Sequence, residues 1–131
     1  SALMAHLLGV HTARDLLASW EKMANEGGKL VKTWVYTQLV AEVECHPLWT
    51  LHHFRNKNKQ EIDFLVTDKK QRKLGIEVKA SESISADDFK HLKWFSAQVD
   101  DFVGLVLYAG NDILSFGSRL YAVPFSALWA R

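Results

Sequence analysis

The segment DFVGLVLYAG, residues 101–110, constrains the fold of this 131-residue chain more than any other feature. It is a nearly continuous apolar run of strand length, and a strand without a polar face has to be covered on both sides. We therefore predict a central strand in a sheet that carries helices on both faces. The rest of the chain must supply those helices and the neighbouring strands.

The helices are predicted from apolar residues that repeat with helical spacing. In residues 28–44, GKLVKTWVYTQLVAEVE, the apolar stripe is formed by Leu30, Val31, Trp34, Val35 and Leu39. An earlier helix is predicted within residues 11–28. A third is expected to begin at Ser85-Ala86-Asp87-Asp88, which resembles a capping box.

From residue 50 the apolar period changes to two. The segments TLHHFR, EIDFLVTD and KLGIEVKA alternate and are joined by short polar turns, which predicts a three-stranded antiparallel meander. After the central strand, residues 113–130 are expected to form a short strand pair and a terminal turn of helix. The result is an α/β fold with a central mixed sheet, an antiparallel hairpin and flanking helices.

Length and composition fit a single domain over residues 1–131, with 48% hydrophobic and 24% charged residues. The net charge is only +1, so the whole chain is not a polycation. Its apolar runs are too short to cross a bilayer, and no membrane partner is expected. Cys45, the single cysteine, favours a reducing compartment, and we expect a cytoplasmic location.

Three ionisable residues of the hairpin are expected to lie together. Strict alternation places Asp63 on one face of its strand with Glu61 and Leu65, and it places Glu77 and Lys79 on one face of the next strand. The opposite face of the first strand would carry Ile62, Phe64 and Val66. A turn centred near residue 70 or 71 sets Asp63 across from Glu77 or from Lys79, and both registers align the apolar residues.

Two carboxylates and a lysine in contact suit metal-assisted hydrolysis of a phosphodiester. Asp63 and Glu77, with a backbone carbonyl such as that of Val78, are ligands that Mg²⁺ prefers, and Lys79 would orient water or stabilise phosphate charge. The alternative is a cross-strand salt bridge, worth about 0.2–1 kcal/mol. The spacing alone leaves both interpretations open.

Basic residues gather around the same hairpin. From Arg55 to Lys79 there are eight basic residues against four acidic ones. Arg55, Lys57 and Lys59 are therefore candidates for binding nucleic-acid phosphates. The alternative is that these lysines occupy solvated turns and protect a sheet edge from pairing.

Asp63, followed after thirteen residues by Glu77-Val78-Lys79, resembles the PD-(D/E)xK motif of restriction-endonuclease-like nucleases. The wider pattern resembles the C-terminal domain, mostly catalogued as being of unknown function, of a prokaryotic family of AAA-type ATPases. The segments that carry this resemblance are SALMAHLLGV, GKLVKTWVYTQL, FRNKNKQEIDFLV, GIEVKAS and LYAGND with LYAVPFSAL, from Ser1 to Leu128.

The resemblance implies a restriction-endonuclease-like core that acts on or binds DNA. Asp63 and Glu77 would be ligands of Mg²⁺, and Lys79 would be the catalytic lysine. It also implies an N-terminal ATPase module as the partner, so that this chain would be a C-terminal fragment. ATP would bind only to that module, because the chain has no G-x-x-x-x-G-K-[ST] loop.

The sequence departs from the family pattern in the helix of residues 28–44. Where the family has acids, roughly as in GKLVETWVYNEL, this chain has Lys32 and Gln38. Glu42, one turn beyond Gln38, is a candidate substitute for the missing acidic ligand. Three functions stay open: metal-dependent DNA hydrolysis, DNA binding without hydrolysis, and an inactive regulatory or docking domain of the ATPase.

Overall fold

The computed structural model describes residues 28–128, so the helix predicted within residues 11–28 lies outside the described part. The described elements follow one another in this order: α3 (Gly28–Glu44), β1 (Thr50–Arg55), β2 (Glu61–Thr67), β3 (Lys73–Lys79), the 3-10 helix η1 (Ala86–Phe89), α4 (Lys90–Gln98), β4 (Phe102–Tyr108), β5 (Leu114–Ser115), β6 (Leu120–Pro124) and the 3-10 helix η2 (Phe125–Leu128).

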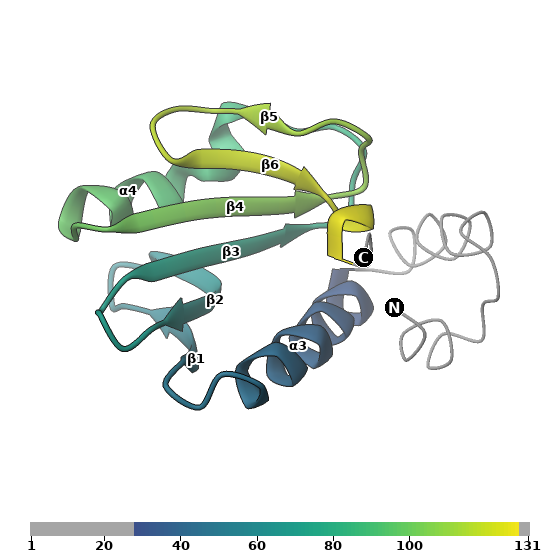
Figure 1. The fold of residues 1–131 in the computed structure, drawn as a ribbon. Helices are drawn as coiled ribbons and strands as arrows, with labels where there is room; N and C mark the ends of the chain where they lie inside the picture. The colour runs from purple at the N-terminus through teal and green to yellow at the C-terminus, as the bar shows by residue number, and fades with distance from the viewer. Residues whose placement is uncertain (1–27, 129–131) are drawn as a thin grey trace, which may run out of the picture.

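The strands form one six-stranded mixed sheet in the order β1-β2-β3-β4-β6-β5 (Figure 1). Strands β1, β2 and β3 pair antiparallel, which confirms the predicted meander. Strand β4 runs parallel to β3 on one side and to β6 on the other. The predicted α/β class, the mixed sheet and the central position of β4 are therefore confirmed.

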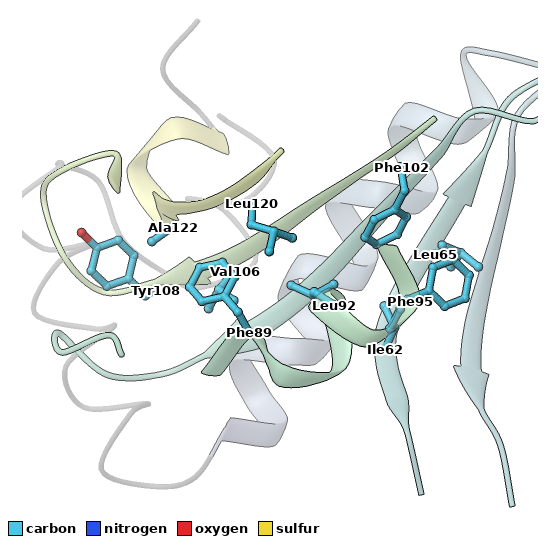
Figure 2. Close-up of a cluster of buried hydrophobic side chains, with 10 residues drawn as sticks. All are labelled: Ile62, Leu65, Phe89, Leu92, Phe95, Phe102, Val106, Tyr108, Leu120 and Ala122. Carbon is cyan, nitrogen blue, oxygen red and sulfur yellow. The ribbon is translucent and has the colours of Figure 1, made fainter. Parts of the chain in front are cut away.

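Each face of the sheet carries one hydrophobic cluster. Helix α3 packs on one face through Val31, Trp34, Val35 and Leu39. On the other face, η1 and α4 contribute Phe89, Leu92 and Phe95 to the cluster drawn in Figure 2.

Strand β4 serves both clusters. Leu105 and Leu107 pack on the α3 side, while Val106 and Tyr108 pack on the α4 side. The apolar run is thus explained by burial on both faces.

The helix predicted from Ser85 begins with the expected capping box, formed between Ser85 and Asp88. Its first turn is the 3-10 helix η1, and the α-helix proper starts at Lys90. No helix within residues 28–128 has the length and apolar character that crossing a bilayer needs.

The prediction that side chains alternate strictly between the two faces of β2 is wrong between Ile62 and Phe64. His52 pairs with Leu65 and Phe54 pairs with Ile62, so two residues of β2 lie opposite the single residue His53 of β1. This is the geometry of a β-bulge, which inserts one extra residue and re-aims its side chain. Ile62 and Leu65 consequently pack on the α4 side, whereas Phe64 packs on the α3 side.

Candidate functional site

The candidate site lies where the β2–β3 hairpin opens, away from its turn. The two strands pair only from Phe64–Ile76 to Thr67–Lys73. Extending that register by one residue puts Asp63 opposite Glu77, which decides between the two registers that the sequence allowed. Because the ladder stops here, side chains rather than backbone groups have to satisfy the polar atoms of the opening.

Asp63 is the buried acid of this opening, with only 6% of its side chain exposed. Its Oδ2 accepts a hydrogen bond of 2.9 Å from the backbone N–H of Val78, in place of a carbonyl from β2. On the β1 side, His53 Nδ1 lies 3.2 Å from the backbone carbonyl oxygen of Asp63. The bulge and these two contacts fix the direction of the carboxylate.

The other oxygen of Asp63 faces a lysine from α3. Lys32 Nζ lies 3.0 Å from Asp63 Oδ1, and 45% of the Lys32 side chain is exposed. Partial burial works against the charged ammonium, but the hydrogen bond and the charge of Asp63 outweigh it and raise the pKa of Lys32. The Lys32 side chain is therefore a positively charged ammonium in contact with the buried Asp63 carboxylate.

Glu77 is the second carboxyl group of the opening. Burial, followed by repulsion from the Asp63 carboxylate, raises the pKa of Glu77 to about 9. Glu77 is therefore neutral at pH 7, since the nearby Lys32 offsets these effects only in part. Its Oε1 is buried without a hydrogen-bond partner in the described part of the chain.

Lys79, the third residue of the predicted cluster, has a different partner. Its Nζ lies 2.8 Å from Asp88 Oδ2 in η1. The same oxygen accepts the backbone N–H of Ser85 at 2.8 Å. The structure thus brings Asp63 and Glu77 together, and it ties Lys79 to the cap of the next helix.

As arranged, these residues do not fit Mg²⁺. The ion needs several negatively charged or neutral oxygens that are free to point at it. Here one oxygen of Asp63 faces the Lys32 ammonium and the other accepts an N–H, so neither is free to point at an ion. Among residues 28–128, no group of three or more His, Cys, Asp or Glu side chains is placed to hold a metal ion.

The proposed helix contributors lie further along α3 than Lys32. Gln38 is six residues on, which is about 9 Å along the axis and about 240° around it. Glu42 is ten residues on, about 15 Å along the axis. The acidic substitute sought in the sequence is thus displaced from the carboxyl pair, and Lys32 is the residue of α3 that reaches Asp63.

The predicted phosphate contacts surround the β1–β2 loop. Arg55, Lys57 and Lys59 are exposed, and no ion pair is found for them within the described residues. Asn56 closes the loop, because its Oδ1 accepts the backbone N–H groups of Asn58 and Gln60 at 3.0 Å each. The loop therefore presents its positive charges from a fixed backbone.

A pocket of about 300 Å³ lies between α3 and the strands β1 and β2. We call it the Tyr36 pocket; its lining residues are Lys32, Thr33, Tyr36, His53, Glu61, Asp63 and Phe64. Sequence reasoning missed Tyr36 and His53 as parts of the site. The spacing of Lys32 and Tyr36, four residues apart on one helix, was the available signal, since such residues share a face.

A larger hollow of about 460 Å³ lies at the turn end of the hairpin, over Trp49, Val66, Leu74 and Val103. Four of its rim charges form the pairs Arg72–Asp68 and Arg119–Asp101, and Lys73 is a fifth charged residue of the rim. Of these two hollows, the Tyr36 pocket is the one that lies beside Asp63 and the β1–β2 loop.

One family model matches the chain over residues 27–128, and its description is "Domain of unknown function (DUF4143)". No curated protein and no solved structure matches the chain. The matched range contains every described element and therefore the whole candidate site.

Proposed function

The chain belongs to the DUF4143 family of domains of unknown function, and from that premise we propose that it is a nuclease-like accessory domain that binds DNA without hydrolysing it. The observation that carries this proposal is the 3.0 Å ion pair between Lys32 Nζ and Asp63 Oδ1. In this proposal the domain serves an ATPase module of AAA type, the partner that the resemblance of its sequence implies.

The absence of hydrolysis is inferred from the charge balance of the opening. Metal-assisted hydrolysis needs a cation that polarises the phosphoryl oxygen and activates water. In this chain the positive charge beside Asp63 is an ammonium, which has no coordination site to offer a water or a phosphate. Asp63 pairs with Lys32 and Lys79 pairs with Asp88, so two of the three motif residues are already engaged within the protein.

DNA binding is inferred from the exposed cations at the β1–β2 loop. Each cation that neutralises a phosphate releases a counterion, which makes binding depend steeply on salt. Arg55, Lys57 and Lys59 extend from the same end of β1 and β2 at which Lys32 and the Tyr36 pocket lie. In this proposal a bound strand would therefore lie beside the pocket.

The binding test uses a labelled DNA with a duplex part and a single-stranded tail, titrated at several salt concentrations. Replacing two loop lysines (Lys57→Gln with Lys59→Asn) should weaken binding and lower the salt slope by about 2. Asn suits position 59, where φ is 65°. The matched control, Lys69→Gln with Lys70→Gln in the β2–β3 turn, changes net charge equally and should bind like the unaltered protein.

The cleavage test incubates the same DNA with the domain and Mg²⁺ or Mn²⁺. We expect intact DNA, together with binding that survives the change Asp63→Asn. Metal-dependent cutting that disappears in Asp63→Asn would contradict the proposal and establish a working nuclease site.

A second candidate function is an inactive docking domain of the ATPase. It is favoured by three exposed apolar side chains near the opposite sheet edge, Ile113, Leu114 and Tyr121. The same titration separates the candidates, because a domain that only docks would show no salt-dependent binding of DNA.

A further inference from the structure

We propose that the Tyr36 pocket binds an unpaired base of a DNA strand, so that this domain prefers single-stranded to duplex DNA. The inference rests on the proposed DNA binding and names its ligand. It starts from the position of Tyr36, a large aromatic side chain that is 50% exposed and lines the pocket beside the basic loop.

The Tyr36 ring packs on one side against a neighbouring aromatic ring. It stacks on Phe64 of β2 with a centroid distance of 6.0 Å and an interplanar angle of 28°. Phe64 in turn packs against the α3 cluster, so the ring rests on the core. An aromatic ring that is supported on one side and open on the other is a platform on which a nucleobase can stack.

The polar lining suits the edge of a base. Glu61 is 41% exposed, and its Oε1 lies 3.7 Å from His53 Nε2. A carboxylate of this kind accepts hydrogen bonds from an exocyclic amino group, such as that of cytosine. Thymine has no exocyclic amine, and the pocket should therefore favour cytosine over thymine.

The pocket is continuous with the phosphate-binding loop. Glu61 is the register partner of Arg55, the residue at which the β1–β2 loop begins. A strand whose base enters the pocket would thus have its phosphates near Arg55, Lys57 and Lys59.

A base in a duplex is covered on both faces by its neighbours, so it can stack on Tyr36 only after leaving the helix. The geometry therefore favours strands whose bases are already unpaired.

The test measures the affinity of the domain for oligo(dC), oligo(dT) and a duplex of equal length at one salt concentration. We expect oligo(dC) to bind most tightly and the duplex most weakly. Tyr36→Ala should weaken oligo(dC) binding by roughly 5- to 150-fold, the range that one base–aromatic stack gives. Glu61→Leu, which has no hydrogen-bond acceptor in its side chain, should abolish the preference for oligo(dC) over oligo(dT).

Tyr121→Ala is the matched control, because Tyr121 is 37% exposed on β6, far along the sheet order from β1 and β2. It should bind oligo(dC) like the unaltered protein. Tyr36→Leu guards against a folding defect, since leucine keeps an apolar contact with Phe64 but has no ring to stack on.

The two proposals fail in different ways. If the unaltered domain binds none of the three DNAs, both the proposed function and this inference are overturned. If it binds DNA in a salt-dependent way, but prefers the duplex or is unaffected by both Tyr36 changes, only the base-binding pocket is overturned.

Discussion

The two ends of the β2–β3 hairpin provide hydrogen-bond acceptors for their backbone N–H groups in different ways. At the turn end, four residue pairs form a regular ladder, and Asp68 closes the turn by accepting the backbone N–H groups of Lys70 and Arg72 at 2.9 Å each. At the open end the ladder has stopped, and the Asp63 side chain accepts the N–H of Val78. Each end therefore depends on one aspartate that bonds to the backbone.

The two ends differ in the origin of the cation that neutralises the aspartate. Asp68 pairs with Arg72, four residues along the chain and close to solvent. Asp63 is buried and pairs with Lys32, which belongs to another element. A local pair near water can rearrange at little cost, whereas a buried carboxylate depends on the residues that surround it. The open end should therefore be the more sensitive to substitution and to pH.

The largest effect is expected for Asp63→Ala. Removing this carboxylate leaves the N–H of Val78 without its acceptor and Lys32 without its partner, which should lower the free energy of unfolding by about 2–4 kcal/mol. Chemical denaturation measures this directly. Asp68→Ala is the matched control and should cost clearly less, because water can replace its bonds. Equal losses for the two variants would contradict the difference between the two ends.

The contrast between the ends also explains what the sequence could predict. The meander, the central strand and the helix of residues 28–44 follow from apolar periods, which report burial directly. The paired ladder that leads to the turn follows from the same pattern, since Val66 and Leu74 align as apolar partners.

The open end could not be predicted because a bulge interrupts the period. One extra residue opposite His53 turns Asp63 toward α3, and strict alternation gives no sign of it. The pairing of Asp63 with Lys32 is a contact between distant segments, and no local pattern encodes it. The proximity of Asp63 and Glu77 was predictable from the turn, whereas the engagement of Lys79 by Asp88 was not.

The next effect concerns pH. The folded state holds a proton on Glu77 up to about pH 9, whereas the ordinary pKa is 4.5. Because the folded state binds this proton more tightly, the stability it contributes is complete below the ordinary pKa and is lost as the pH rises toward 9. The free energy of unfolding should therefore fall with a negative slope as the pH rises across this range.

Glu77→Gln should remove this slope while changing stability little near pH 4, since a glutamine resembles the protonated acid. Denaturation curves at several pH values measure the slope, and Glu82→Gln, at an exposed position, should leave it unchanged. A slope that persists in Glu77→Gln would show that another group causes it.

The smallest losses of stability are expected when Lys32 and Lys79 are replaced. Lys32→Met should cost about 1 kcal/mol, because it leaves Asp63 without its cation although solvent reaches the site. Lys79→Met should cost about 0.5 kcal/mol, since Lys79 and Asp88 form a partly exposed pair. Thermal unfolding of both variants ranks them, and the reverse order would show that Lys79 rather than Lys32 supports the open end.

The central claim is that the Lys32 ammonium supplies the positive charge that a metal ion would otherwise bring to Asp63 and Glu77. The most direct measurement is a calorimetric titration of Mn²⁺ into the unaltered domain and into Lys32→Glu, with thermal unfolding in parallel. We predict no binding and no thermal shift for the unaltered domain. For Lys32→Glu we predict binding and a rise in melting temperature with Mn²⁺, because ligands that bind the folded state stabilise it. Binding of Mn²⁺ by the unaltered domain that is lost in Asp63→Asn would contradict the claim.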